Sequence, residues 1–177
     1  MNLLLTRRRI LKHLCLPAAG AAAAWAARAA TSATPSAATP ATASAAPGVG
    51  HGMLVQVWKS PTCGCCKDWI AHLQAHGFQV QVQETGNTAA RARLGIDMRF
   101  GSCHTAVVQG YVLEGHVPAR EIGRLLAERP KALGLAVPGM SVGSPGMDGP
   151  EYGGRRDPYD VLLLTGGTTS RVFQAYR

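Results

Sequence analysis

Hydrophobic and polar positions follow two different rhythms in the middle of the chain. Residues 52–58 (GMLVQVW) alternate and are rich in β-branched side chains, which predicts a strand. Residues 78–84 (FQVQVQE) alternate strictly and predict a second strand. Between them the rhythm changes to helical spacing over residues 66–77. A strand, a helix and a second strand are therefore expected in this order.

The predicted helix has recognisable signals at both ends. Its apolar positions are Trp69, Ile70 and Leu73. Either Ser60 or Thr62 is placed to cap its first turn. Gly77 is the residue at which it is expected to end, because glycine readily adopts the left-handed conformation that closes helices.

The rest of the chain completes a single α/β domain. Further elements are predicted as a short helix over residues 88–95, two strands within 104–115 joined at Gln109-Gly110, a helix over 118–130 and a closing hairpin over 159–176. From the first strand to the last helix the order is β-α-β-α-β-β-α. That order predicts a thioredoxin-like domain followed by a C-terminal hairpin.

The first 50 residues differ in composition from the rest. Residues 1–30 start with a basic stretch and continue as an Ala/Leu-rich run, which is the layout of a signal peptide. The pair Arg7 and Arg8 matches the twin-arginine export pattern. Residues 31–50 contain mostly Ala, Ser, Thr and Pro with no charge, and predict a flexible, disordered linker. The folded domain is therefore expected over residues 51–177 of a periplasmic protein.

The charge balance changes once this leader is set aside. The whole chain has 18 basic and 10 acidic residues, a formal net charge of +8. Five basic residues and no acidic ones lie in the leader, so 13 basic and 10 acidic residues remain, a net charge of +3. Nucleic-acid binding is therefore not expected. The apolar run of the leader is shorter than the ~20 residues that span a bilayer, so no stable membrane insertion is expected after processing.

Outside the leader the cysteines are concentrated at one place. They are Cys63, Cys65, Cys66 and Cys103. The first three lie within four positions, CGCC, between the predicted first strand and first helix, where the helix dipole favours thiolates. In a thioredoxin-like fold the loop before the third strand faces this helix start. We therefore expect Cys103 to meet the other three sulfurs.

Two kinds of chemistry suit this group of thiols. Cys63 and Cys66 form a C-x-x-C pair, which supports thiol–disulfide exchange, although a third neighbouring thiol invites wrong pairings. Four thiolates about 4 Å apart repel one another strongly. One zinc ion would leave a net charge of −2, whereas several bridged Cu(I) ions neutralise the group, and thiolates select Cu(I). The spacing favours a compact cluster of more than one Cu(I) ion, with Cu(II) left open.

Four further side chains are candidate metal ligands: His104, His116, Met140 and Met147. His104 follows Cys103 directly and is expected to bind metal. An exposed or capping role fits His116 equally well, and loop packing fits the two methionines equally well. His72 and His76 lie on the outer turns of the predicted helix and are expected at the surface. No catalytic residue is indicated.

Three segments in order, TCGCCKDW, GSCHTAVVQGYVLEGHVPAREIGRLL and GLAVPGMSVGSPGM, resemble the CopG-type periplasmic copper-resistance proteins, a metal-binding family of unknown function. The resemblance runs from about residue 53 to the end of the chain. It implies a thioredoxin-like fold, with copper bound by the C-x-C-C cysteines and the later cysteine, Cys103. It also implies a role in copper tolerance, by interconverting copper redox states or by passing copper to other periplasmic copper proteins.

Two functional hypotheses follow. The first is an exported protein that holds Cu(I) in a cysteine-thiolate cluster and acts in copper resistance or handling. The alternative is a periplasmic thiol–disulfide oxidoreductase that uses Cys63 and Cys66. A copper-dependent oxidoreductase lies between the two, and the sequence does not distinguish it from passive copper storage.

Overall fold

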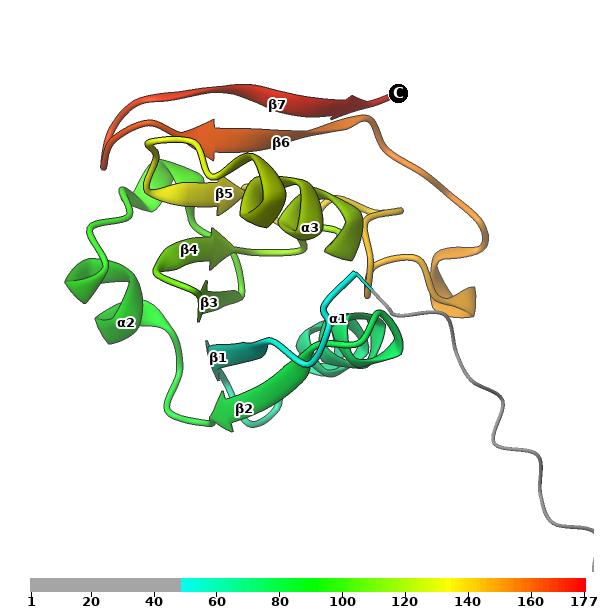
Figure 1. Ribbon diagram of the computed structural model, residues 1–177. Coiled ribbons are helices and arrows are strands. Elements are labelled where there is room, and N and C mark those ends of the chain that lie inside the picture. The colour runs from blue at the N-terminus through cyan, green and yellow to red at the C-terminus, as the bar shows by residue number, and fades with distance from the viewer. Residues whose placement is uncertain (1–48) are drawn as a thin grey trace, which may run out of the picture. The chain divides into compact units, whose positions relative to one another are not determined.

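A computed structural model describes residues 49–177, which form one mixed α/β domain built on a seven-stranded sheet (Figure 1). The predicted signal peptide and nearly all of the predicted linker lie outside the described residues. The elements are β1 (Leu54–Lys59), α1 (Gly64–Ala75), β2 (Gln79–Gln83), α2 (Thr88–Arg93), η1 (Met98–Phe100), β3 (His104–Val108), β4 (Tyr111–Glu114), α3 (Ala119–Glu128), β5 (Gly134–Ala136), η2 (Pro150–Tyr152), β6 (Tyr159–Leu164) and β7 (Ser170–Tyr176). Among these helices, none is both long enough and apolar enough to cross a membrane.

The strands lie side by side in the order β2-β1-β3-β4-β5-β6-β7. β1 runs parallel to β2 and antiparallel to β3, and β3 and β4 form an antiparallel pair. The element order predicted from the hydrophobic pattern is present from β1 to α3. β5 was not predicted: it has only three residues, all of them buried, and therefore carries no alternation. It joins the predicted closing hairpin, β6 and β7, to the rest of the sheet.

Hydrophobic side chains form a cluster on each face of the sheet. The larger cluster joins α1 and α3 to the strands, with Trp69 and Ile122 among its fully buried members. The smaller cluster includes Ile96 and Phe100, which lie between α2 and β3. Val112 belongs to the smaller cluster and Leu113 to the larger, as expected for neighbouring residues of a strand. His104 and Thr105, the first two residues of β3, are both fully buried.

The start of α1 differs from the prediction. The N-cap is Cys63, in an extended conformation and without a side-chain cap hydrogen bond. The hydroxyl groups of Ser60 and Thr62 lie 3.1 Å apart and bond to each other instead. The helix thus begins at Gly64, inside the CGCC segment, so that two of its cysteines occupy the first turn. Its end agrees with the prediction, because Gly77 follows with a φ of +88°.

Candidate metal centre

Four cysteine sulfurs from two distant segments lie within 4.8 Å of one another. Cys63 and Cys66 are joined by a disulfide, whereas Cys65 and Cys103 are free. The sulfur of Cys103 lies 3.4 Å from that of Cys66 and 3.8 Å from that of Cys65. The sulfurs of Cys63 and Cys65 are 3.6 Å apart. The structure therefore brings the CGCC turn and Cys103 together, as the sequence predicts.

Two buried imidazoles also contact the sulfur of Cys103. The Nε2 atom of His116 lies 3.2 Å from the Cys103 sulfur, and the Nδ1 atom of His104 lies 3.4 Å from it. Both rings are fully buried, and their centroids are 4.9 Å apart in an edge-on arrangement. Cys103 and the two histidines form a second group whose donor atoms lie within 4.8 Å of one another. Cys103 is thus shared by a group of four sulfurs and a group with two imidazoles.

A backbone carbonyl fixes the orientation and tautomer of His116. Its Nδ1 atom lies 2.8 Å from the carbonyl oxygen of Pro145. Because a carbonyl only accepts hydrogen bonds, Nδ1 must carry the proton and donate it. In the neutral ring Nε2 then holds a free lone pair, and this is the atom that faces Cys103. Metal-binding histidines in proteins are held in the same way.

The loop that carries this carbonyl is packed tightly onto the start of α1. Gly146 has a φ of +81°, and a Cβ added there would lie 2.6 Å from both the Cys65 carbonyl oxygen and the Trp69 nitrogen. Only glycine allows this close approach without movement of the backbone. The loop thereby places the carbonyl of Pro145 within hydrogen-bond distance of Nδ1 of His116. The sequence gives no sign of this role of Pro145, because every residue has a backbone carbonyl.

His104 has a different environment. Its ring packs against Trp69 with a centroid distance of 4.2 Å. Trp69 is itself held by a 2.8 Å hydrogen bond from its indole N–H to the carbonyl of Val117. The Nε2 atom of His104 is buried and has no hydrogen-bond partner among the described residues. An imidazole nitrogen in this position is available as a ligand or as a donor to a bound group.

Burial controls the protonation of these groups. Burial, reinforced by Cys65, raises the pKa of Cys103 to about 12. Burial and the neighbouring His116 hold the pKa of His104 well below its usual value, and burial also lowers the pKa of His116. The two rings are therefore neutral near pH 7 and offer lone pairs. A soft cation would favour the thiolate of Cys103, because metal binding displaces the thiol proton.

The two predicted methionine ligands have different environments. Met147 is buried, and its sulfur accepts a 3.2 Å hydrogen bond from the hydroxyl of Tyr152. Met140 is 54% exposed. The residue before it, Gly139, donates a 2.9 Å hydrogen bond to the carbonyl of Gly101, in the loop that leads to Cys103. Met140 thus lies beside the Cys103 loop, whereas the Met147 sulfur is bonded to a tyrosine.

The prediction that His72 lies at the surface is wrong. His72 is half-buried, and its Nε2 atom accepts a 3.1 Å hydrogen bond from the backbone N–H of Ala119, the first residue of α3. Burial, with a smaller effect of His76, lowers the pKa of His72 to about 4. The residue therefore joins α1 to α3. Nothing in the sequence near His72 signals an acceptor for a helix 47 residues away.

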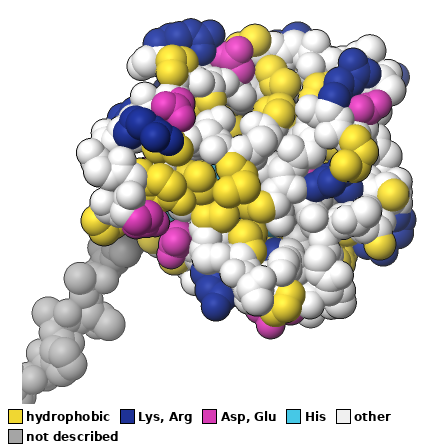
Figure 2. Space-filling view, turned by 180° about the vertical axis from the view of Figure 1, so that it is seen from behind, with side chains coloured by type: hydrophobic (Ala, Val, Ile, Leu, Met, Phe, Trp, Pro, Cys, Tyr) yellow, Lys and Arg dark blue, Asp and Glu magenta, His cyan; other side chains and the backbone are white. Residues whose placement is uncertain are grey.

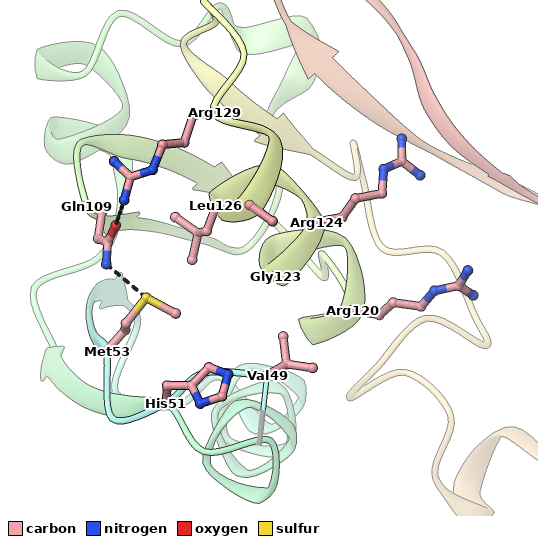
Figure 3. A pocket seen from close by; sticks show the side chains of 10 residues that line it. Val49, His51, Met53, Gln109, Arg120, Gly123, Arg124, Leu126 and Arg129 are labelled. Atoms are coloured by element: carbon pink, nitrogen blue, oxygen red, sulfur yellow. Dashed lines mark hydrogen bonds between the residues drawn. The ribbon is translucent and has the colours of Figure 1, made fainter. Parts of the chain in front are cut away.

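A separate pocket of about 500 Å³ lies between the N-terminal segment and α3 (Figure 3). Its lining residues are Val49, His51, Met53, Gln109, Arg120, Gly123, Arg124, Leu126, Ala127 and Arg129. This set contains none of the four clustered cysteines. Seen from behind, the molecule has a continuous patch of hydrophobic side chains, with basic and acidic side chains interspersed around it (Figure 2). The basic side chains on this face do not form a stripe.

Comparisons with known proteins point to copper. A family described as a protein of unknown function, DUF411, matches residues 100–147. A solved structure named copper resistance protein copG, form 2, is 46% identical, covers 71% of this chain and 99% of its own, and has a TM-score of 0.65. Form 1 of the protein with that name is 45% identical, covers 71% and 98%, and also has a TM-score of 0.65. No protein of curated function matches the chain.

Proposed function

The chain belongs to the family of the CopG copper resistance proteins, and on this premise we propose that it binds Cu(I) through Cys63, Cys65, Cys66 and Cys103 and acts in copper handling. His104 and His116 join the proposed ligand set, and Met140, which follows the residue that bonds to the Cys103 loop, is a further proposed ligand. The observation that carries the proposal is that Cys103 is shared by a group of four sulfurs and a group with two neutral imidazoles. This donor set is soft, and soft donors select Cu(I).

The structure also sets a condition for binding. Two of the four sulfurs, those of Cys63 and Cys66, are in a disulfide. Two electrons and two protons convert this disulfide into two thiols, so the fully ligating site requires a reductant. Reduction leaves four thiols in a partly buried place, where bound Cu(I) ions neutralise the thiolates that repel one another. The proposed site therefore holds more than one Cu(I) ion.

Copper stoichiometry tests this proposal. The purified chain is reduced with a phosphine, kept anaerobic, and dialysed separately against Cu(I) and Zn²⁺. We expect more than one Cu(I) per chain in the wild type and a sharp fall in Cys103→Ala, because that variant removes the sulfur shared by both groups of ligands. Retention of less than one Cu(I) per chain by the reduced wild type would overturn the proposal.

We further propose that the bound copper is passed on or alternates between Cu(I) and Cu(II), as a copper-dependent oxidoreductase would require. The support is the mixture of sulfur and imidazole donors, since imidazole binds both copper oxidation states. Electron paramagnetic resonance of the loaded chain during oxidation separates the two modes. A Cu(II) signal that appears without loss of copper supports redox cycling, whereas release of copper on oxidation supports transfer.

A second candidate function is thiol–disulfide exchange. The disulfide between Cys63 and Cys66 lies at the start of α1, where thiol oxidoreductases have theirs. The strand order β2-β1-β3-β4, with α1 and α3 packed into the same hydrophobic cluster, supports a thioredoxin-like arrangement. This function predicts that Cys63→Ser abolishes insulin reduction whereas Cys65→Ser does not. Absence of turnover by the wild type would exclude it.

We also propose that the protein is exported to the periplasm by the twin-arginine route. Arg7 and Arg8 and the apolar run that follows them support this, although they lie outside the described residues. Replacement of both arginines by lysine should leave the protein in the cytoplasm, as measured by cell fractionation. Unchanged export of this variant would favour the general secretory route.

A further inference from the structure

A buried ion pair lies next to the loop that carries Cys103. Glu114, at the end of β4, is fully buried, and Arg91, on α2, is 6% exposed. The Nε atom of Arg91 donates a 2.9 Å hydrogen bond to Oε1 of Glu114, and its Nη2 atom lies 2.8 Å from the same oxygen. The other carboxylate oxygen accepts a 2.6 Å hydrogen bond from the hydroxyl of Thr105. Both carboxylate oxygens are therefore satisfied.

Both members of the pair also bind the residue before Cys103. The backbone N–H of Ser102 donates a 2.7 Å hydrogen bond to Oε1 of Glu114. The carbonyl of Ser102 accepts a hydrogen bond from Nη2 of Arg91 and a 3.1 Å hydrogen bond from the side-chain amide of Asn87. The backbone donor and acceptor of Ser102 are thus both held by the ion pair. This leaves the loop little freedom to move away from the CGCC turn.

The ion pair and the proposed metal ligands lie on opposite faces of the sheet at the start of β3. Successive residues of a strand point to opposite faces, and the first two residues of β3 are His104 and Thr105. His104 contacts Cys103 and Trp69 on the face of α1. Thr105 is the registered partner of Glu114 and contacts it on the other face. The ion pair can therefore hold the backbone without occupying any ligand position.

Energetics argue for a specific role. Removal of two charges from water costs several kcal/mol per ion, and the attraction between them repays this only with good geometry and further hydrogen bonds. A packed apolar pair is often at least as stable. The additional partners here are the backbone atoms of the Cys103 loop. The feature that an apolar pair of the same size could not reproduce is therefore the fixed position of this loop.

We propose that Arg91 and Glu114 are positioning residues for Cys103, which hold its sulfur against the CGCC turn and the two imidazoles before copper arrives. The proposal deepens the proposed function and rests on it for its effect on copper affinity. The pair touches no metal and acts through the backbone of Ser102. Residues outside the ligand set that orient metal ligands typically change metal affinity by about 10- to 100-fold.

Comparison of two buried glutamates tests the proposal. Glu114→Gln keeps the size of the side chain but leaves Arg91 without a counter-charge. Glu121→Gln removes another fully buried carboxylate, which lies on α3 and accepts a 2.7 Å hydrogen bond from Tyr176. Cu(I) affinity is measured by competition with bicinchoninate and normalised to the folded fraction from circular dichroism. We expect a loss of about 10- to 100-fold for Glu114→Gln and no more than about twofold for Glu121→Gln.

Hydrogen exchange supplies a readout that needs no copper. In the metal-free protein the amide of Ser102 should exchange at least about tenfold faster in Glu114→Gln than in the wild type or in Glu121→Gln. Asn87→Ala removes the hydrogen bond from the Asn87 amide to the Ser102 carbonyl and should lower copper affinity by a few-fold. This variant replaces Glu114→Gln in the test if Glu114→Gln does not fold. Equal copper affinity in wild type and Glu114→Gln, or an equal loss in both glutamine variants, would overturn the proposal.

The two proposals fail in different ways. If the wild type binds no Cu(I), the proposed function is wrong, and the exchange rate of Ser102 still reports whether the ion pair holds the loop. If the wild type binds Cu(I) and Ser102 exchanges equally fast in all variants, the positioning role is wrong and copper binding stands.

Discussion

The two segments that supply sulfur are placed by different means. The CGCC segment spans the N-cap and first turn of α1, so helix geometry alone brings its three sulfurs together. Cys103 comes from a loop 37 residues further along the chain than Cys66. Its position depends on the pairing of β3 with β1 and β4, on the ion pair of Arg91 and Glu114, and on the contact of this loop with Gly139.

This contrast separates a local half of the site from a long-range half. Substitutions that touch neither the CGCC turn nor its contact with Gly146 should leave the distances among its three sulfurs nearly unchanged. The distances from Cys103 to the other sulfurs should respond to substitutions on α2, β4 and the loop of Gly146. Trp69 connects the two halves of the site, because it lies on α1 with the CGCC turn and its ring packs against His104, the residue after Cys103.

The largest effect on stability is expected at Trp69, which connects the two halves of the site. Trp69→Ala removes a fully buried indole that also donates a hydrogen bond to Val117, so the free energy of unfolding should fall by about 3–5 kcal/mol. Urea denaturation followed by circular dichroism measures the change. Trp58→Ala is the matched control, since Trp58 is half-buried and lies under the guanidinium of Arg93. An equal loss for both tryptophans would show that Trp69 has no special place between the halves.

A somewhat smaller effect is expected at Gly146, in the loop that packs against the start of α1. Gly146→Ala places a methyl group 2.6 Å from backbone atoms at a positive φ and should cost about 1–3 kcal/mol. Because this loop carries the acceptor for His116, the NMR signals of that imidazole should shift as well. Gly64→Ala is the control: nothing lies within 4 Å of the added Cβ, so the first turn of α1 should be stabilised by about 0.4–1 kcal/mol. Destabilisation by Gly64→Ala would show that the CGCC turn depends on contacts with the rest of the protein at this position.

The sequence predicts the local half well, because its signals lie next to one another. The CGCC spacing and the helical pattern after it suffice to place three sulfurs at a helix start. The meeting with Cys103 was also predictable, because the order of strands and helices brings the start of β3 to that helix. What failed locally was the cap: Ser60 and Thr62 bond to each other and leave Cys63 at the helix boundary.

The long-range contacts were not predictable, for identifiable reasons. Arg91 and Glu114 are 23 residues apart, and nothing in the sequence distinguishes their pairing from that of other charged residues. The acceptor of His116 is a backbone carbonyl, which every residue has. His72 was assigned to the surface because it lies on an outer turn of the predicted helix, and the structure shows that it accepts a hydrogen bond from α3. Each of these contacts joins residues that are more than 20 positions apart in the sequence.

The contact between α1 and α3 gives an effect that depends on pH. His72 has its pKa lowered to about 4, mainly by burial, with His76 lowering and Asp148 raising it. Between pH 6.5 and 4 the unfolded chain binds more protons at this residue than the folded protein, so the stabilisation is complete above pH 6.5 and is lost as the pH falls toward 4. After allowance for its partial exposure, the loss should be about 1–2 kcal/mol.

His72→Gln isolates this contribution, because glutamine can accept the Ala119 hydrogen bond at every pH. The difference in unfolding free energy between pH 7.5 and pH 4.5 should be smaller in the variant than in the wild type. His51→Gln, at an exposed position, should leave it unchanged. A wild-type pH dependence that persists fully in His72→Gln would show that other groups account for it.

The smallest effect on stability is expected at Met140, an exposed residue beside the Cys103 loop. Met140→Leu replaces a thioether that is 54% exposed, so the free energy of unfolding should change by less than about 0.5 kcal/mol. If the Met140 sulfur helps to hold copper beside the Cys103 loop, Cu(I) affinity should fall by up to about tenfold while stoichiometry is retained. Met53→Leu is the matched control, at a half-buried methionine that lines the separate pocket and not the Cys103 loop. Equal affinities in the wild type and Met140→Leu would remove Met140 from the ligand set, and the long-range half of the site would then consist of Cys103 and the two imidazoles.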